Sequence, residues 1–153
     1  MSDAEIIVKN LAYNDNISFP VLIPNIKGMV LRNSLMVLLY AGFDNFYAAT
    51  NGKMKEIAVF TSASESFSVK NTNCSIVESL ERLKIVMRAA KSKNIRARGY
   101  VSCIVKCPYE GLIDPDKVLK VTTELLDMGC YEVSLGDTIG AATPGNKIYQ
   151  STV

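Results

Sequence analysis

The chain has 153 residues, of which 48% are hydrophobic and 21% charged, with a net charge of +2. This composition is typical of a globular domain with a sizeable core and excludes an intrinsically disordered chain. The near-neutral charge argues against a nucleic-acid-binding protein. No apolar run reaches the roughly 18 residues of a membrane span. The chain contains no histidine, which excludes any histidine-dependent catalytic or metal site formed by this chain alone.

The four cysteines are predicted to be free thiols with structural roles. They are Cys74, Cys103, Cys107 and Cys130. The start of the chain lacks the basic and apolar regions of a secretory signal, and no arginine precedes Arg32 as in a transit peptide, so we expect a reduced, intracellular setting. Cys103 and Cys107 have the spacing of a metal-binding pair, but no second pair is present to complete a zinc site. Packing roles are therefore favoured over metal binding.

The first half of the chain contains two strand signals and one helix signal. Residues 19–24 form a short apolar run between prolines, and residues 57–60 form a compact apolar run before a polar loop; both are typical of strands. Residues 29–50 are apolar with few charges, which indicates a buried helix followed by a loop. Ser75 and Glu78 have capping-box spacing and predict a helix that begins there and ends near Asn94.

The second half continues the alternation of strands and helices. Residues 99–105 and 131–135 are predicted strands. Asp114 and Pro115 are typical of a helix start and Gly129 of a helix end, and residues 143–145 resemble another helix start. This order predicts right-handed parallel β-α-β units, either in an open doubly wound sheet or in a (β/α)₈ barrel. In both folds the loops after the strands are the functional end.

Several segments, taken together and in order, resemble hydroxymethylglutaryl-CoA lyases. They are residues 20–25, 55–60, 62–67, 70–76, 98–103, 107–111 (CPYEG), 128–132 and 134–140 (SLGDTIG). The resemblance covers roughly residues 1–28 and 53–145. It implies an α/β fold, an incomplete (β/α)₈ TIM barrel with about strands three to five and their helices. Residues 1–153 would form a single partial barrel domain of the pyruvate carboxyltransferase type, with an atypical insertion at residues 29–47 that has no place in the helix layer.

The resemblance also implies an activity, a metal and a location. The family cleaves 3-hydroxy-3-methylglutaryl-CoA to acetyl-CoA and acetoacetate, in leucine breakdown and ketone-body formation. It uses Mg²⁺ or Mn²⁺ as a Lewis acid. The implied partner is an acyl-CoA substrate, with neither nucleic acid nor membrane, and the family allows a homodimer. The implied location is the mitochondrial matrix, although the chain as it stands, without a transit peptide, is expected to be cytoplasmic.

The sequence lacks several motifs of the family. The Arg-Asp pair of the first strand, the His-x-His pair, the cysteine in a glycine-rich loop and the late asparagine ligand are absent. We therefore expect no metal ligand in this chain and no activity from the chain alone. The alternative is a non-catalytic truncated or splice-variant fragment that acts through partner binding.

A few residues correspond to the family's active site. Asp137 follows a predicted strand; by itself it would cap its own turn, but the resemblance favours a catalytic carboxylate that binds substrate and manages protons. The resemblance assigns Tyr100, Ser102 and Thr138 to substrate binding, and Tyr100 and Ser102 share one face of a strand, although core packing explains them equally well. The segment from Lys70 to Asn73 either forms a turn or contacts the CoA arm.

Overall fold

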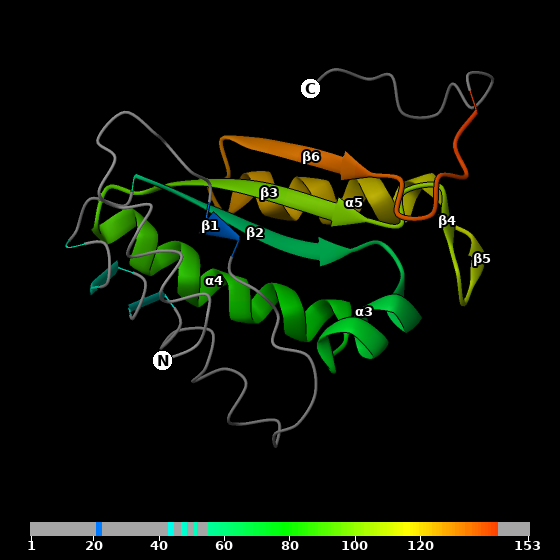
Figure 1. Cartoon of the computed structure of the whole chain (residues 1–153), viewed down its shortest axis with the longest axis horizontal. Coiled ribbons are helices and arrows are strands. Elements are labelled where there is room, and N and C mark those ends of the chain that lie inside the picture. Colours follow the sequence, from blue (N-terminus) through cyan, green and yellow to red (C-terminus); the bar gives the residue numbers. More distant parts are fainter. Residues whose placement is uncertain (1–20, 23–42, 45–46, 49–50, 52–54, 144–153) are drawn as a thin grey trace.

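The computed structural model describes residues 21–22, 43–44, 47–48, 51 and 55–143 (Figure 1). In this part of the chain the elements are β1 (Val21–Leu22), β2 (Glu56–Ser62), α3 (Glu65–Thr72), α4 (Ile76–Ser92), β3 (Arg96–Ser102), β4 (Lys106–Cys107), β5 (Gly111–Leu112), α5 (Pro115–Asp127) and β6 (Glu132–Gly136). Strands β1, β2, β3 and β6 form a parallel sheet in that order, and β4 and β5 form an antiparallel hairpin. The predicted parallel α/β arrangement is therefore confirmed. None of the described helices is long and apolar enough to cross a membrane.

One face of the sheet carries the helix layer. Alternate residues of β2 and β3 point to this face, and the register pairs Val59 with Gly99. On β2, Thr61 receives a hydrogen bond from Ser79 Oγ of α4 at 3.1 Å. On β3, a Cβ added at Gly99 would lie 3.0 Å from Leu125 Cδ1, so α5 packs closely where the side chain is absent. Helices α4 and α5 thus cover the same face of the sheet.

The opposite face of the sheet, which we call the polar face, presents the other alternate residues. From the amino to the carboxyl ends of the strands, its register groups are Glu56 and Arg96; Ala58, Arg98 and Glu132; Phe60, Tyr100 and Ser134; and Ser62, Ser102 and Gly136. On β3 the residues toward the helices are buried, while those on the polar face are exposed or half-buried. This layered arrangement is typical of the interior of a parallel barrel.

The hydrophobic core contains a residue from the predicted insertion. Phe43 is fully buried and is part of the core, and Tyr47 packs against that core. Residues 43–44 and 47–48 are helical. The end of the segment at 29–47 therefore contributes to the core, contrary to the expectation that it has no place in the helix layer. Residues 29–42 lie outside the described part.

The helix ends follow the predicted signals. Ser75 caps α4, with a reciprocal hydrogen bond from its own N–H to the Glu78 carboxylate at 2.9 Å. Asp114 caps α5, which has a proline in its first turn. Gly129 has a φ of +102° just beyond α5, a conformation that favours glycine. These predictions are confirmed because each depends on a local interaction that sequence spacing specifies.

Other element limits differ from the predictions. Strand β3 spans Arg96–Ser102 rather than residues 99–105, because Cys103 adopts a left-handed φ of +60° that ends the strand. Helix α3 and the β4–β5 hairpin occupy segments in which the sequence patterns predicted neither a helix nor a strand. Of the predicted strand at residues 19–24, the described residues include only β1, which is a strand. Of the predicted helix start at residues 143–145, they include only Thr143.

Candidate functional site

The predicted site residues lie at the carboxyl ends of β3 and β6. Ser102 is the last residue of β3, Tyr100 precedes it on the same face, and Asp137 and Thr138 follow β6 directly. The strands are parallel, so their carboxyl ends meet at one edge of the sheet, where α/β folds bind their ligands. Helix α3 and the β4–β5 hairpin lie beside this edge, next to the arrowheads in Figure 1.

Backbone N–H groups hold both carboxylate oxygens of Asp137. Oδ1 accepts a hydrogen bond from the N–H of Ala141 at 3.0 Å, and Oδ2 accepts one from the N–H of Ala142 at 2.7 Å. These bonds stabilise the charged form and hold the pKa of Asp137 below its ordinary value. The carboxylate therefore caps its own turn and also places a fixed negative charge at the strand ends. Its role toward a substrate stays a prediction.

Thr138 ties the loop after β6 to the end of β3. The N–H of Cys103 donates a hydrogen bond to Thr138 Oγ1 at 2.7 Å. The left-handed backbone of Cys103 also interrupts the strand alternation, so its thiol lies beside Thr138 and Ser62. The thiol is fully buried, and this burial raises its pKa. A neutral, buried thiol suits a packing role rather than a nucleophile.

Tyr100 and Ser102 share the polar face and are both half-buried. The Tyr100 hydroxyl interacts with the guanidinium of Arg98. The carbonyl of Ser102 accepts hydrogen bonds from the N–H of Ala63 at 3.0 Å and from Ser62 Oγ at 3.3 Å. The end of β2 is thereby fixed against the end of β3. Both hydroxyl-bearing side chains thus stand on a rigid part of the sheet.

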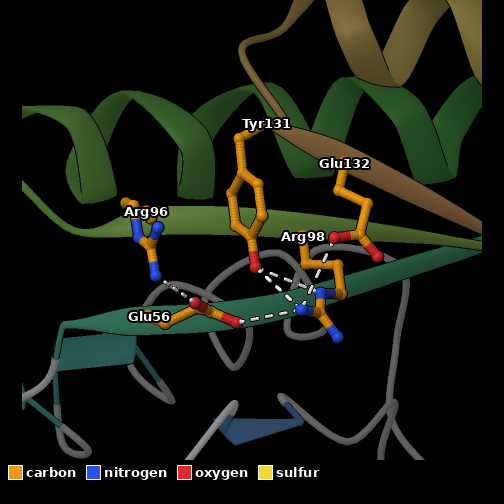
Figure 2. A network of polar contacts seen from close by, with 5 residues as sticks. All are labelled: Glu56, Arg96, Arg98, Tyr131 and Glu132. Atoms are coloured by element: carbon orange, nitrogen blue, oxygen red, sulfur yellow. Dashed lines mark hydrogen bonds and ion pairs between the residues drawn. The ribbon is translucent and has the colours of Figure 1, made fainter. Parts of the chain in front are cut away.

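A charged network occupies the amino ends of the same face (Figure 2). Glu56 is nearly buried and contacts Arg96 Nη2 at 2.9 Å and Arg98 Nη2 at 3.9 Å. Arg98 Nη2 also lies 3.6 Å from Glu132 and donates a hydrogen bond to the Tyr131 hydroxyl at 3.0 Å. Each charge faces an opposite one, which offsets the cost of burying the carboxylate. In barrels this end supports stability rather than catalysis, so we assign the network a structural role.

Arg98 was not among the residues predicted for this face. A usable signal was present, because Arg98 alternates with Tyr100 and Ser102 and therefore shares their face. Hydrogen bonds to the hydroxyls of Tyr100 and Tyr131 raise the pKa of Arg98 above its ordinary value. Arg98 consequently links the structural network to the base of the candidate site.

The β4–β5 hairpin is fastened to α3. Ser64 Oγ, at the N-cap of α3, donates a hydrogen bond to Cys107 Sγ at 2.9 Å. The N–H of Ser66 donates to Glu110 Oε1. Burial raises the pKa of Cys107, but the hydroxyl of Ser64 and the N–H groups of Tyr109 and Glu110 outweigh it, so the pKa is lowered overall. All four cysteines are free and buried.

The described residues do not provide a metal site. Within this part of the chain, no group of three or more His, Cys, Asp or Glu side chains could hold a metal ion. The described residues therefore do not fit the Mg²⁺ or Mn²⁺ that the resemblance implies.

Comparison with solved structures defines the fold more closely. HMG-CoA lyase from Brucella melitensis superimposes with a TM-score of 0.76 and 43% identity, over 94% of this chain and 45% of that chain. A more distant HMG-CoA lyase from Acenitobacter baumannii, 23% identical with a TM-score of 0.74, is in complex with coenzyme A and 3-methylmalate and supports the fold alone. The described sheet is therefore a sector of a lyase TIM barrel, and the predicted incomplete barrel is confirmed.

The family follows from the sequence comparisons. The family model described as HMGL-like matches residues 22–151, and the chain belongs to this family. It is 47% identical to the mitochondrial hydroxymethylglutaryl-CoA lyase of Macaca fascicularis over 145 residues, 95% of this chain and 39% of that protein. It is also 47% identical to the cytoplasmic 3-hydroxy-3-methylglutaryl-CoA lyase of Danio rerio over 146 residues, 95% of this chain and 38% of that protein. The chain thus spans about two fifths of the length of these relatives.

Proposed function

We propose that this chain forms the central sector of an enzyme that cleaves 3-hydroxy-3-methylglutaryl-CoA to acetyl-CoA and acetoacetate. The observation that carries the proposal is the placement of Asp137 and Thr138 after β6, beside the end of β3 with Tyr100 and Ser102. This edge is where barrel enzymes perform their chemistry. The relatives named above are lyases of this substrate by their names.

The reaction sets clear tasks for these residues. The tertiary hydroxyl of the substrate loses its proton, the carbon–carbon bond breaks, and its electron pair forms the enolate of acetyl-CoA, which is then protonated. Asp137 is ionised and fixed, so it accepts the hydrogen bond of the tertiary hydroxyl and helps to draw off its proton. Tyr100 and Ser102 donate hydrogen bonds to substrate oxygens, and Thr138 contacts the substrate beside the carboxylate.

The proposal includes a metal, a partner and a location. Mg²⁺ or Mn²⁺ would be held by residues other than the described ones and would act as a Lewis acid. The substrate is an acyl-CoA, and the whole enzyme is proposed to be a homodimer. The mitochondrial matrix is the proposed location; relatives named as mitochondrial and as cytoplasmic both exist.

A hybrid enzyme tests this function. Residues 55–143 would replace the corresponding segment of the M. fascicularis lyase, and acetoacetate would be measured with Mg²⁺ present. We expect turnover from the hybrid and none from the 153-residue chain alone, because the chain has no histidine. A folded but inactive hybrid would contradict the proposal and favour the alternative of a non-catalytic chain that binds partners.

A further inference from the structure

The backbone of Cys103 has a conformation that its residue type does not explain. Among the described residues, four residues other than glycine have a positive φ. Three of them are asparagines (Asn51, Asn73 and Asn94), a residue type that tolerates the left-handed region because its short polar side chain bonds locally. The fourth is Cys103, with a φ of +60°. A strained residue of this kind persists only where its surroundings impose it, and such residues gather at functional sites.

The left-handed turn sends two successive N–H groups toward β6. In an extended strand, successive N–H groups point to opposite edges. Here the N–H of Cys103 donates to Thr138 Oγ1 at 2.7 Å, and the N–H of Ile104 donates to the carbonyl of Gly136 at 3.3 Å. The carbonyl of Ser102, by contrast, accepts its hydrogen bond from the segment that follows β2. The end of β3 therefore binds the β6 side with two donors while it stays attached to the β2 side.

These two donors hold the residues on either side of Asp137. Gly136 is the last residue of β6, and Thr138 follows the carboxylate in the loop. The N–H groups of Ala141 and Ala142 bind the two carboxylate oxygens from the far end of that loop. Asp137 is thus held from β3 and from its own loop, at the edge where the arrowheads of β3 and β6 lie (Figure 1).

The side chain of Cys103 takes no part in these bonds. The thiol is fully buried and belongs to the core, while both contacts to the loop come from backbone N–H groups. Another residue could make the same contacts if its backbone adopted the left-handed conformation. A β-branched residue would do so only with greater strain.

We propose that Cys103 is a positioning residue, whose left-handed backbone turns two N–H groups onto the loop and thereby aims the Asp137 carboxylate at the substrate. The inference rests on the proposed function for the role of Asp137. What it adds is a backbone requirement at the end of a different strand, with the thiol as packing only.

The pKa of Asp137 in the 153-residue chain reports this geometry. Hydrogen bonds from the backbone N–H groups of residues 139–142, led by Ala142, lower this pKa, so it should rise when the loop loosens. A ¹³C NMR titration of the carboxyl group measures it. In Cys103→Val most of the lowering should be lost, whereas Cys103→Ala keeps the turn and should keep the pKa. The matched control is Cys130→Val, the same exchange at a buried cysteine without a positive φ, which should leave the pKa of Asp137 unchanged.

A second pair of variants tests the acceptor. Thr138→Val removes the hydroxyl that accepts the N–H of Cys103, so the pKa of Asp137 should rise. Thr138→Ser keeps an acceptor and should preserve the pKa. This comparison keeps the inference testable even if Cys103→Val does not fold.

Turnover separates positioning from stability. In the hybrid with the M. fascicularis lyase, Cys103→Val should lower kcat by roughly 10-fold to 100-fold, the cost of a misplacement of about 1 Å. KM should stay within about threefold, because the lost alignment acts in the transition state rather than in substrate binding. Cys130→Val should leave kcat unchanged even where it lowers the melting temperature.

Failure of this inference is distinct from failure of the proposed function. If folded Cys103→Val and Thr138→Val keep the pKa of Asp137, or if Cys103→Val keeps the kcat of the hybrid, the turn does not position Asp137 and the inference is wrong, while an active hybrid still supports the proposed function. If Cys103→Ala raises the pKa as much as Cys103→Val, the thiol is the acting group and the inference is also wrong. A hybrid that is inactive before any substitution contradicts the proposed function instead, and the titration of the chain then decides whether the turn fixes Asp137.

Discussion

The folded loop around Asp137 stabilises the charged form of its carboxyl group. The N–H groups of Ala141 and Ala142 bind its two oxygens and lower its pKa. A carboxyl with a lowered folded-state pKa stabilises the protein above its unfolded-state pKa, roughly 3.9, and loses that contribution as the pH falls through the folded-state value. The same bonds fix the position of the carboxylate for the proposed hydrogen bond to the substrate hydroxyl.

The first prediction concerns the stability of an Asp137→Asn variant. At pH 7 it should be less stable than the unmodified chain, and the difference should shrink as the pH falls below about 4. Urea unfolding at several pH values measures it. The control is Asp127→Asn, at an exposed helix end. A stability difference that does not change with pH would show that the backbone bonds do not depend on the charge.

The residues of the candidate site differ in how far the sequence could predict them. Asp137 was singled out by the family resemblance, because a carboxylate in a loop after a strand predicts by itself only a cap of its own turn. The contact between Thr138 and Cys103 was not predictable, because it depends on a left-handed backbone that only the packed strand ends impose. Arg98 was missed because the predicted strand began at residue 99, whereas the register places Arg96 and Arg98 in β3.

At the scale of elements, α4 depends on its reciprocal cap. Ser75 Oγ accepts the N–H of Glu78 at 3.1 Å, and Glu78 accepts the N–H of Ser75. Ser75→Ala should therefore lower the free energy of unfolding by about 1 kcal/mol, while Ser75→Thr should be nearly neutral. Chemical denaturation measures both. Ser92→Ala, at the exposed end of the same helix, is the matched control and should cost less. Equal losses for the two alanine variants would contradict a special role for the cap.

Helix α3 shows why some elements escaped prediction. Its buried positions are Ser68 and Thr72, which are polar, so the helix has no apolar stripe. Thr72 Oγ1 donates to the carbonyl of Ser68 at 2.7 Å, and Ser68 Oγ donates to the carbonyl of Cys74 at 2.8 Å. Helices α4 and α5 were predictable because they combine caps with apolar faces, whereas α3 is held by side-chain hydrogen bonds that only the tertiary structure reveals.

For the whole molecule, Phe43 tests whether the segment before β2 belongs to the fold. Phe43 is fully buried in the core. Phe43→Ala should lower the free energy of unfolding by about 3–5 kcal/mol. Val77→Ala, at a position 69% exposed, is the control and should stay within about 0.5 kcal/mol. If both variants have the same free energy of unfolding, the segment before β2 is dispensable for folding, as the sequence alone suggested.

The two ends of the polar face have different roles in the molecule. Its amino end carries the compensated network of Glu56, Arg96 and Arg98, and its carboxyl end carries Ser102 and the loop with Asp137. Sequence periodicity predicted the parallel units but did not decide between an open sheet and a barrel, because closure depends on strand tilt and stagger across the whole sheet. The resemblance and the structural comparison decide it.

The most direct test of this account is the turnover of Asp137→Asn in the hybrid with the M. fascicularis lyase. The substitution keeps the shape of the side chain and removes its charge. We predict that kcat falls by roughly 100-fold or more, in the range of general acid–base roles, with little change in metal affinity. If kcat instead stays within a few-fold while the melting temperature drops, Asp137 only caps its loop, and the catalytic assignment at the strand ends is wrong.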